Sequence, residues 1–121
     1  MQDLRILVVE DDYLIAQEVR RDLERAGAAV IGPVPTVERA LQLLDSEPAI
    51  NVGVLDVNLG TEKSFAVAAA LEARAIPYLF ATGYSSGDIP AEWRHATIVI
   101  KPLRIEAVER LVSTAGQRGD V

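Results

Sequence analysis

Short apolar runs alternate along this chain with segments that have the periodicity of amphipathic helices. The apolar runs cover residues 4–9, 28–34, 52–55, 77–81 and 97–100. Runs of this length, bounded by Gly, Pro or charged residues, are typical of strands that are buried on both faces of a parallel sheet. Their alternation with helical segments predicts an α/β domain.

Four helices are predicted between and after these strands. They run from Asp11 or Asp12, as the N-cap, to Gly27; from Thr36 to just before Pro48; from Ser64 to Arg74; and from Ile105 to Gly116. Residues 58–61 are predicted to form a loop. The run of Ser, Gly, Asp and Pro at 85–90 interrupts any helical periodicity, so we predict only a turn or two around residues 91–94.

Five strand–helix units with short links predict a parallel sheet that is covered by helices on both faces. We expect a flavodoxin-like three-layer sandwich with strand order 2-1-3-4-5, in which the fourth helix is short or irregular. The predicted domain covers residues 1–117 and leaves 118–121 as a short polar tail, with no output domain in this chain. This order places the first and third strands side by side.

Three of the five apolar runs end on charged residues. Glu10-Asp11-Asp12 follows the first strand, Asp56 follows the third and Lys101 follows the last. Ligands of open α/β sheets bind beyond the carboxyl ends of the strands, so we expect these charges to share one cleft. Crowded acids raise each other's pKa, and the cluster therefore favours a bound cation.

The residue types in this cleft suit a divalent metal and a phosphoryl group. Mg²⁺ prefers oxygen ligands, and we expect Asp11 and Asp56 to bind it directly and Glu10 to act through a water. The charged Lys101 cannot bind a metal, so its role would be to neutralise an anion. Thr82, at the end of the fourth strand, could donate a hydrogen bond to that anion. A carboxylate held between metal and lysine can attack phosphorus, and Asp56 is the best candidate nucleophile.

Each of these residues also has a simpler structural explanation. The acidic run could cap a helix in solvent, and Asp12 is expected to do only that. Asp56 could begin a turn, and the hydroxyl of Thr82 could bond to backbone. The joint occurrence of Asp56, Thr82 and Lys101 at strand ends favours a site over these separate explanations.

Over essentially its whole length the chain resembles the receiver domains of two-component response regulators. The matching motifs are Ile6-Leu7-Val8-Val9-Glu10-Asp11-Asp12, Val54-Leu55-Asp56-Val57-Asn58-Leu59, Ala81-Thr82-Gly83 and Ile100-Lys101-Pro102. The resemblance implies that Asp56 is the phosphoacceptor, and that Thr82 and Lys101 are the switch threonine and the phosphoryl-binding lysine. The residues that would bind Mg²⁺ are Glu10, Asp11, Asp56 and, through its backbone carbonyl, Asn58. The Lys101–Pro102 peptide bond is often cis in this family.

The sequence departs from the common receiver pattern between Thr82 and Lys101, where the chain is shorter than usual. Ile98 occupies the strand position that normally carries a switch aromatic. Residues 80–84, Phe-Ala-Thr-Gly-Tyr, are similar to a motif of an alphaproteobacterial single-domain subgroup. Tyr84 could therefore replace the missing aromatic.

Composition limits the classes of partner. The 121 residues carry a net charge of −6, which disfavours nucleic-acid binding, and they include no cysteine. No apolar run approaches the roughly 20 residues of a membrane span, and no signal segment precedes the first strand, so we expect a cytoplasmic protein. The only histidine, His95, is predicted on the surface, and Trp93 is predicted to pack against the domain.

The resemblance implies a signalling protein rather than an enzyme that acts on other substrates. A sensor histidine kinase or a histidine phosphotransfer protein would donate the phosphoryl group, and a downstream protein would bind the switched surface. The outer face of the last helix could form an interface, and a weak homodimer is a separate expectation. Two alternatives are a small phosphatase with an aspartate nucleophile and a nucleotide or flavin carrier. The carrier is disfavoured because no Gly-rich loop follows the first strand.

Overall fold

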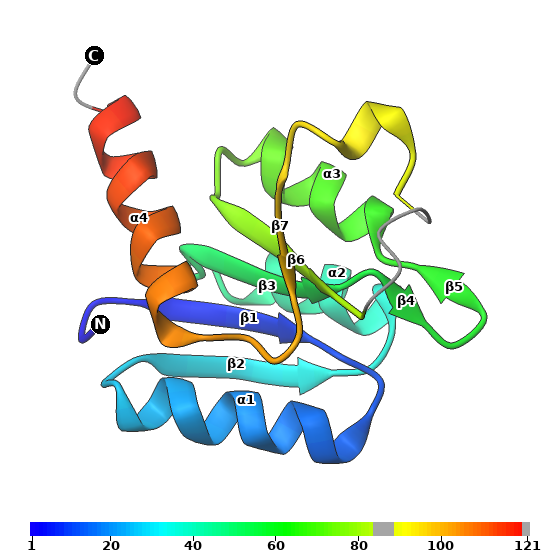
Figure 1. Cartoon of the computed structure of the whole chain (residues 1–121), viewed down its shortest axis with the longest axis horizontal. Helices are drawn as coiled ribbons and strands as arrows, with labels where there is room; N and C mark the ends of the chain where they lie inside the picture. Colours follow the sequence, from blue (N-terminus) through cyan, green and yellow to red (C-terminus); the bar gives the residue numbers. More distant parts are fainter. Residues whose placement is uncertain (84–88, 120–121) are drawn as a thin grey trace.

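The computed structural model describes residues 1–83 and 89–119, which form a parallel five-stranded sheet between two layers of helices (Figure 1). The strands of this sheet are β1 (Arg5–Val9), β2 (Ala29–Val34), β3 (Val52–Asp56), β6 (Tyr78–Thr82) and β7 (Thr97–Ile100). Their order is β2-β1-β3-β6-β7. The predicted flavodoxin-like order is therefore confirmed, and β1 and β3 are neighbours.

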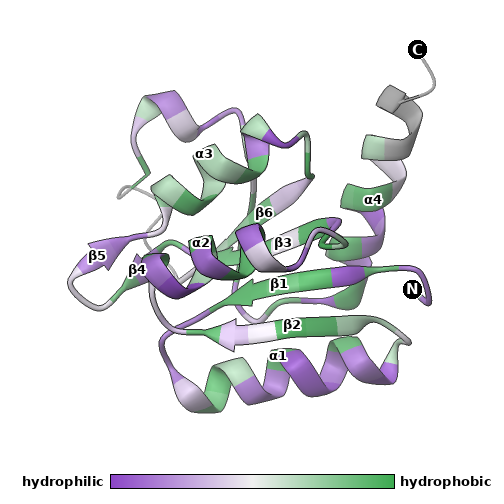
Figure 2. Cartoon of the chain, turned by 180° about the vertical axis from the view of Figure 1, so that it is seen from behind, coloured by the Kyte–Doolittle hydropathy of each residue, from purple (hydrophilic) through white to green (hydrophobic). Residues whose placement is uncertain are grey.

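The helices lie in two layers, one on each face of the sheet. They are α1 (Tyr13–Arg25), α2 (Val37–Ser46), α3 (Phe65–Ala73) and α4 (Ile105–Gly119), with a 3₁₀ turn η2 (Ala91–Trp93). Alternate strand residues point to opposite faces: Leu7 and Leu55 pack with α2 and α3, while Val8 and Val54 pack with α1 and α4. Figure 2 shows most of β1 in the green of apolar residues, whereas hydrophilic residues dominate α1.

Two helix starts follow the sequence signals closely. Asp12 is the N-cap of α1, and its carboxylate accepts hydrogen bonds from the backbone N–H groups of Leu14 and Ile15 at 3.0 and 3.1 Å. The hydroxyl of Thr36 accepts from the N–H of Arg39 at the start of α2. These bonds satisfy amides that have no partner within their own helix.

The glycine in β3 allows α3 to pack close to the centre of the sheet. A Cβ atom at Gly53 would lie 2.6 Å from Cδ1 of Leu71 and 3.2 Å from Cβ of Tyr78. A side chain here would meet the tip of Leu71 in α3 and the Cβ atom of Tyr78, so Gly53 leaves room for α3 to pack closely on the strand that carries Asp56.

Two sequence predictions were wrong in detail. Residues 58–61 were expected as a loop, but β4 (Asn58–Leu59) and β5 (Glu62–Lys63) form an antiparallel hairpin. The last helix was expected to stop at Gly116 but continues to Gly119, since a glycine weakens a helix by only about 1 kcal/mol. The domain boundary at residue 117 stays a prediction.

The segment between β6 and β7 is short, as expected. Within its described part, residues 89–96, η2 is a single turn, which confirms the predicted turn around 91–94. Trp93 stacks on Phe65 with ring centroids 5.6 Å apart and meets the edge of Phe80 at 6.2 Å. The predicted packing of Trp93 is thus confirmed. The Lys101–Pro102 peptide is cis, as expected, and Gly32–Pro33 is cis as well.

Candidate functional site

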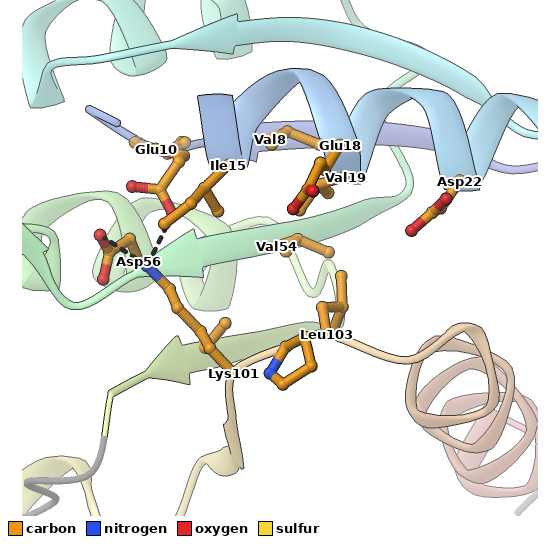
Figure 3. Close-up of a pocket in the computed structure, with 13 residues that line it drawn as sticks. Val8, Glu10, Ile15, Glu18, Val19, Asp22, Val54, Asp56, Lys101 and Leu103 are labelled. Carbon is orange, nitrogen blue, oxygen red and sulfur yellow. Dashed lines mark hydrogen bonds and ion pairs between the residues drawn. The ribbon is translucent and has the colours of Figure 1, made fainter. Parts of the chain in front are cut away.

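The carboxyl ends of β1, β3 and β7 bring Glu10, Asp56 and Lys101 into direct contact. The ammonium of Lys101 donates a hydrogen bond to Oε1 of Glu10 at 2.7 Å and lies 3.2 Å from Oδ2 of Asp56. The side chains of Glu10 and Asp56 are only 5% and 11% exposed, and that of Lys101 is 22% exposed. Figure 3 shows Lys101 reaching from the end of its strand toward both acids.

The backbone around this cleft fixes the acids in place. The N–H of Glu10 donates to the carbonyl of Val34 on β2 at 3.0 Å, and Oε2 of Glu10 accepts from the N–H of Asp12 at 3.1 Å. On β3, Oδ1 of Asp56 accepts from the N–H of Asn58 at 3.3 Å. The site therefore rests on strand ends rather than on long loops.

Three carboxylates converge on one point at this edge of the sheet. Single oxygen atoms of Glu10, Asp11 and Asp56 all lie within 4.8 Å of one another, and Asp11 is exposed to solvent. An all-oxygen donor set that is open on one side matches the needs of a hard divalent cation, which keeps some of its waters. Glu10, Asp11 and Asp56 thus fit a divalent cation, and the ligation by the backbone carbonyl of Asn58 stays a prediction.

Burial sets the charge state of the cleft. Removal from water, reinforced by Asp56, raises the pKa of Glu10 from 4.5 to about 7, against the opposing hydrogen bond from Lys101. Burial alone would lower the pKa of Lys101, but the adjacent Glu10 and Asp56 together raise it above its ordinary value. Lys101 therefore keeps its charge, and Glu10 is the group that gains or loses a proton near neutral pH.

Thr82 is placed beside the same cleft by the backbone. It ends β6, is 3% exposed, and its carbonyl accepts from the N–H of Lys101 at 2.7 Å. In the sheet register Asp56 pairs with Ala81, the residue before Thr82. The backbone thus connects the predicted switch threonine to both Asp56 and Lys101.

Two further predictions concern the missing aromatic. Tyr84 lies outside the described residues. Ile98 is half-buried in β7 and packs against the apolar cluster on the α2 and α3 face. Nothing in that packing calls for an aromatic ring at position 98.

An apolar cavity of about 310 Å³ adjoins the cleft on the α1 face of the sheet. Ile15 and Val19 of α1 and Leu103 after β7 form its apolar walls, and Glu18 and Asp22 add two acids (Figure 3). Ile15 and Val19 recur at helical spacing in the sequence, a pattern that does not distinguish a core position from a cavity wall. Glu18 and Asp22 had no signal, because acidic residues are common on the outer face of a helix.

A second group of polar side chains lies at the amino ends of β6 and β7. Oε2 of Glu72 accepts hydrogen bonds from the Tyr78 hydroxyl at 2.5 Å and from Nε2 of His95 at 2.7 Å. These bonds lower the pKa of Glu72, and its carboxylate raises the pKa of His95. His95 is on the surface, as predicted, but its pairing with Glu72 had no sequence signal.

Within residues 1–83 and 89–119, no helix is long and apolar enough to cross a membrane. No protein-family model matches the chain, and no curated protein matches it either.

Solved structures do match the chain along most of its length. The solution structure of SdrG from Sphingomonas melonis Fr1 is 38% identical, covers 95% of this chain and 98% of its own, and has a TM-score of 0.79. The BeF3-activated conformation of SdrG from Pseudomonas melonis Fr1 is 39% identical over 90% and 92%, with a TM-score of 0.73.

A more distant structure shares the fold. The CheY-like receiver domain protein from Methanospirillum hungatei JF-1 is 22% identical over 97% of both chains, with a TM-score of 0.80. The SdrG match, with its identity and coverage, extends the relationship from fold to family. The chain therefore belongs to the response regulator receiver domains, the phosphoacceptor modules of two-component signalling.

Proposed function

We propose that Asp56 accepts the phosphoryl group, while Glu10, Asp11, Asp56 and the backbone carbonyl of Asn58 hold Mg²⁺. One observation carries this assignment. Asp56 lies at the end of the central strand β3, 3.2 Å from the Lys101 ammonium and within 4.8 Å of both other acids. Glu10 is also beside Lys101, at 2.7 Å, but it is more deeply buried, and burial raises its pKa to about 7, which leaves it partly protonated near neutral pH. Asp56 is therefore the better-placed acceptor between the cation site and the charge of Lys101.

The transfer step follows from this arrangement. An oxygen of Asp56 attacks the phosphorus of a phosphohistidine, the O–P bond forms, and the P–N bond breaks with its electron pair returning to the imidazole. When bound, Mg²⁺ supplies positive charge to the phosphoryl oxygens. Lys101 leaves Glu10 to neutralise the same oxygens, and the Thr82 hydroxyl donates a hydrogen bond to one of them.

The acyl phosphate would act as a switch because it changes the partners of Lys101 and Thr82. Thr82 ends β6, and Lys101 follows β7 directly. Movement of these two residues would therefore shift an existing equilibrium between two conformations of the surface around these strands. The protein catalyses only its own phosphorylation and dephosphorylation in this account.

Receiver domains in general exchange phosphoryl groups with histidine kinases or phosphotransfer proteins. We expect the same donors for this chain, and a downstream protein partner that binds the switched surface. The expected cytoplasmic location, the weak homodimer and the lack of direct nucleic-acid binding stay predictions.

The experiment is phosphoryl transfer from a phosphohistidine donor or acetyl phosphate, with Mg²⁺ or with EDTA. We expect a stoichiometric label that needs Mg²⁺ and that hydroxylamine removes, since it cleaves acyl phosphates. A label equal in EDTA would contradict the metal site. Repeated turnover of a phosphate ester would instead favour the aspartate-nucleophile phosphatase.

A further inference from the structure

The hairpin that follows Asp56 is attached to a distant helix through Glu62. Oε2 of Glu62 accepts a hydrogen bond from the backbone N–H of Val37 at 3.1 Å, across 25 residues of sequence. Val37 is the first residue of α2, so its N–H has no partner within the helix. A carboxylate at this position also interacts favourably with the positive end of the helix dipole.

The same hairpin borders the acidic cleft. Asn58 pairs with Lys63 and Leu59 with Glu62, and the amine of Lys63 donates a hydrogen bond to the side chain of Asn58. The tip of the hairpin lies beside the exposed acid, because a Cβ atom at Gly60 would be 3.7 Å from Oδ2 of Asp11.

A hairpin of this size needs support from elsewhere in the fold. Each strand has two residues, and isolated two-stranded hairpins are at best marginally stable in water. Val57 and Leu59 are buried and fix the β4 side. On the β5 side, the bond from Glu62 to α2 holds the chain just before Ser64, whose N–H donates to the carbonyl of Val57 at 3.0 Å.

We propose that Glu62 is a positioning residue for the divalent cation. By anchoring β5 to α2, Glu62 holds the hairpin in place. Asn58, on β4, then keeps the position beside the acidic cleft that a cation needs. This inference rests on the proposed function, in which Asn58 and the three acids bind Mg²⁺. It adds a residue that never touches the metal but sets its affinity.

The coupling must work in both directions. If the Glu62 anchor favours cation binding, the bound cation favours the anchored hairpin by the same free energy. Mg²⁺ should therefore slow the hydrogen exchange of the Val37 N–H, although the cation binds at the other side of the hairpin.

The experiment measures Mg²⁺ affinity by calorimetry and Val37 amide exchange by NMR in the full chain. Glu62→Ala should weaken Mg²⁺ binding about tenfold, the lower end of what outer partners of metal ligands contribute. It should also abolish the effect of Mg²⁺ on Val37. Glu62→Gln keeps an acceptor oxygen and should restore most of the affinity.

Glu38→Ala is the matched control. Glu38 lies exposed in the first turn of α2, next to Val37, and its substitution removes the same charge as Glu62→Ala. It should bind Mg²⁺ like the wild type. Equal affinity in Glu62→Ala and wild type, with wild-type Mg²⁺ binding intact, overturns the role of Glu62 and leaves the proposed function standing. Failure of the wild type itself to bind Mg²⁺ overturns both.

Discussion

The two ends of the sheet each hold a glutamate beside a basic side chain, and burial makes the two pairs behave differently. At the carboxyl ends of the strands, Glu10 is almost fully buried against Lys101, and its pKa rises to about 7. At the amino ends, Glu72 is 41% exposed against His95, and its pKa falls below 4.5. The same residue type is thus disfavoured as an anion at one end and favoured at the other.

The difference separates a site from a structural contact. Exposed ion pairs cost little to form and add little stability, so the Glu72 pair does no more than connect α3 with the chain before β7. Burying two acids and a lysine together is unfavourable unless other charges complete the group. The carboxyl end keeps that unfavourable arrangement, which a metal and a phosphoryl group would balance.

Replacing the basic side chain of each pair should give the largest contrast in the rate of phosphorylation. Lys101→Met should slow phosphorylation by acetyl phosphate at least about 100-fold, as expected when a positioned charge-stabilising donor is lost. His95→Gln should leave the rate within about twofold of the wild type, because that side chain lies at the other end of the strands. Time courses of label incorporation measure both rates, and similar losses in the two variants would remove the distinction.

The pH dependence of stability should reveal the buried glutamate. The folded-state pKa of Glu10, about 7, exceeds its ordinary value of 4.5, so the folded state binds more protons between these pH values. Without divalent metal, stability should therefore fall as pH rises from about 4.5 to about 7 and then level off.

Urea unfolding in EDTA at pH 5 and pH 8 measures this effect. Glu10→Gln should abolish the fall, which at about 1.4 kcal/mol per pKa unit we expect to reach about 3 kcal/mol at most. Mg²⁺ should reduce it in the wild type, because the cation favours the ionised carboxylate. If the stability of Glu10→Gln fell with pH as that of the wild type does, the fall would come from another group and not from the buried carboxyl of Glu10.

The exposed pair should give the smallest effect, in a different pH range. The raised pKa of His95 means that its contribution is complete below its ordinary value of 6.5 and is lost as pH rises through the folded-state value. The lowered pKa of Glu72 means that its contribution is present above 4.5 and is lost at lower pH. The midpoints of thermal unfolding of His95→Gln and of the wild type should differ most between pH 4.5 and pH 6.5, and they should converge as pH rises through the folded-state pKa of His95. His95 also stacks on Trp93, with ring centroids 5.9 Å apart, and a difference that persists at high pH would point to that packing instead.

The sequence predicted the cleft well because strand ends are easily recognised. Short apolar runs marked the strands, and parallel topology brings their carboxyl ends together, so Glu10, Asp56 and Lys101 could be grouped from the order of the strands alone. Asp12 and Thr36 were predicted as caps from local chemistry, and both act as caps.

What the sequence could not predict depends on contacts between distant segments. Glu72 is in α3, Tyr78 begins β6 and His95 lies in the turn before β7, and no spacing rule connects them. The Glu62–Val37 bond likewise joins a hairpin to a helix, and two-residue strands are too short to give an alternating pattern. Local signals therefore predicted the elements and the cleft, while the tertiary hydrogen bonds around it depend on how the elements pack.

Intact mass after incubation with acetyl phosphate and Mg²⁺ tests the central claim most directly. The account predicts that the wild type gains a single phosphoryl group and that Asp56→Asn gains none. Asp12→Asn is the control: asparagine caps helices as well as aspartate, so this variant should gain the group like the wild type. The same mass gain in Asp56→Asn would show that another residue is phosphorylated and would contradict the account.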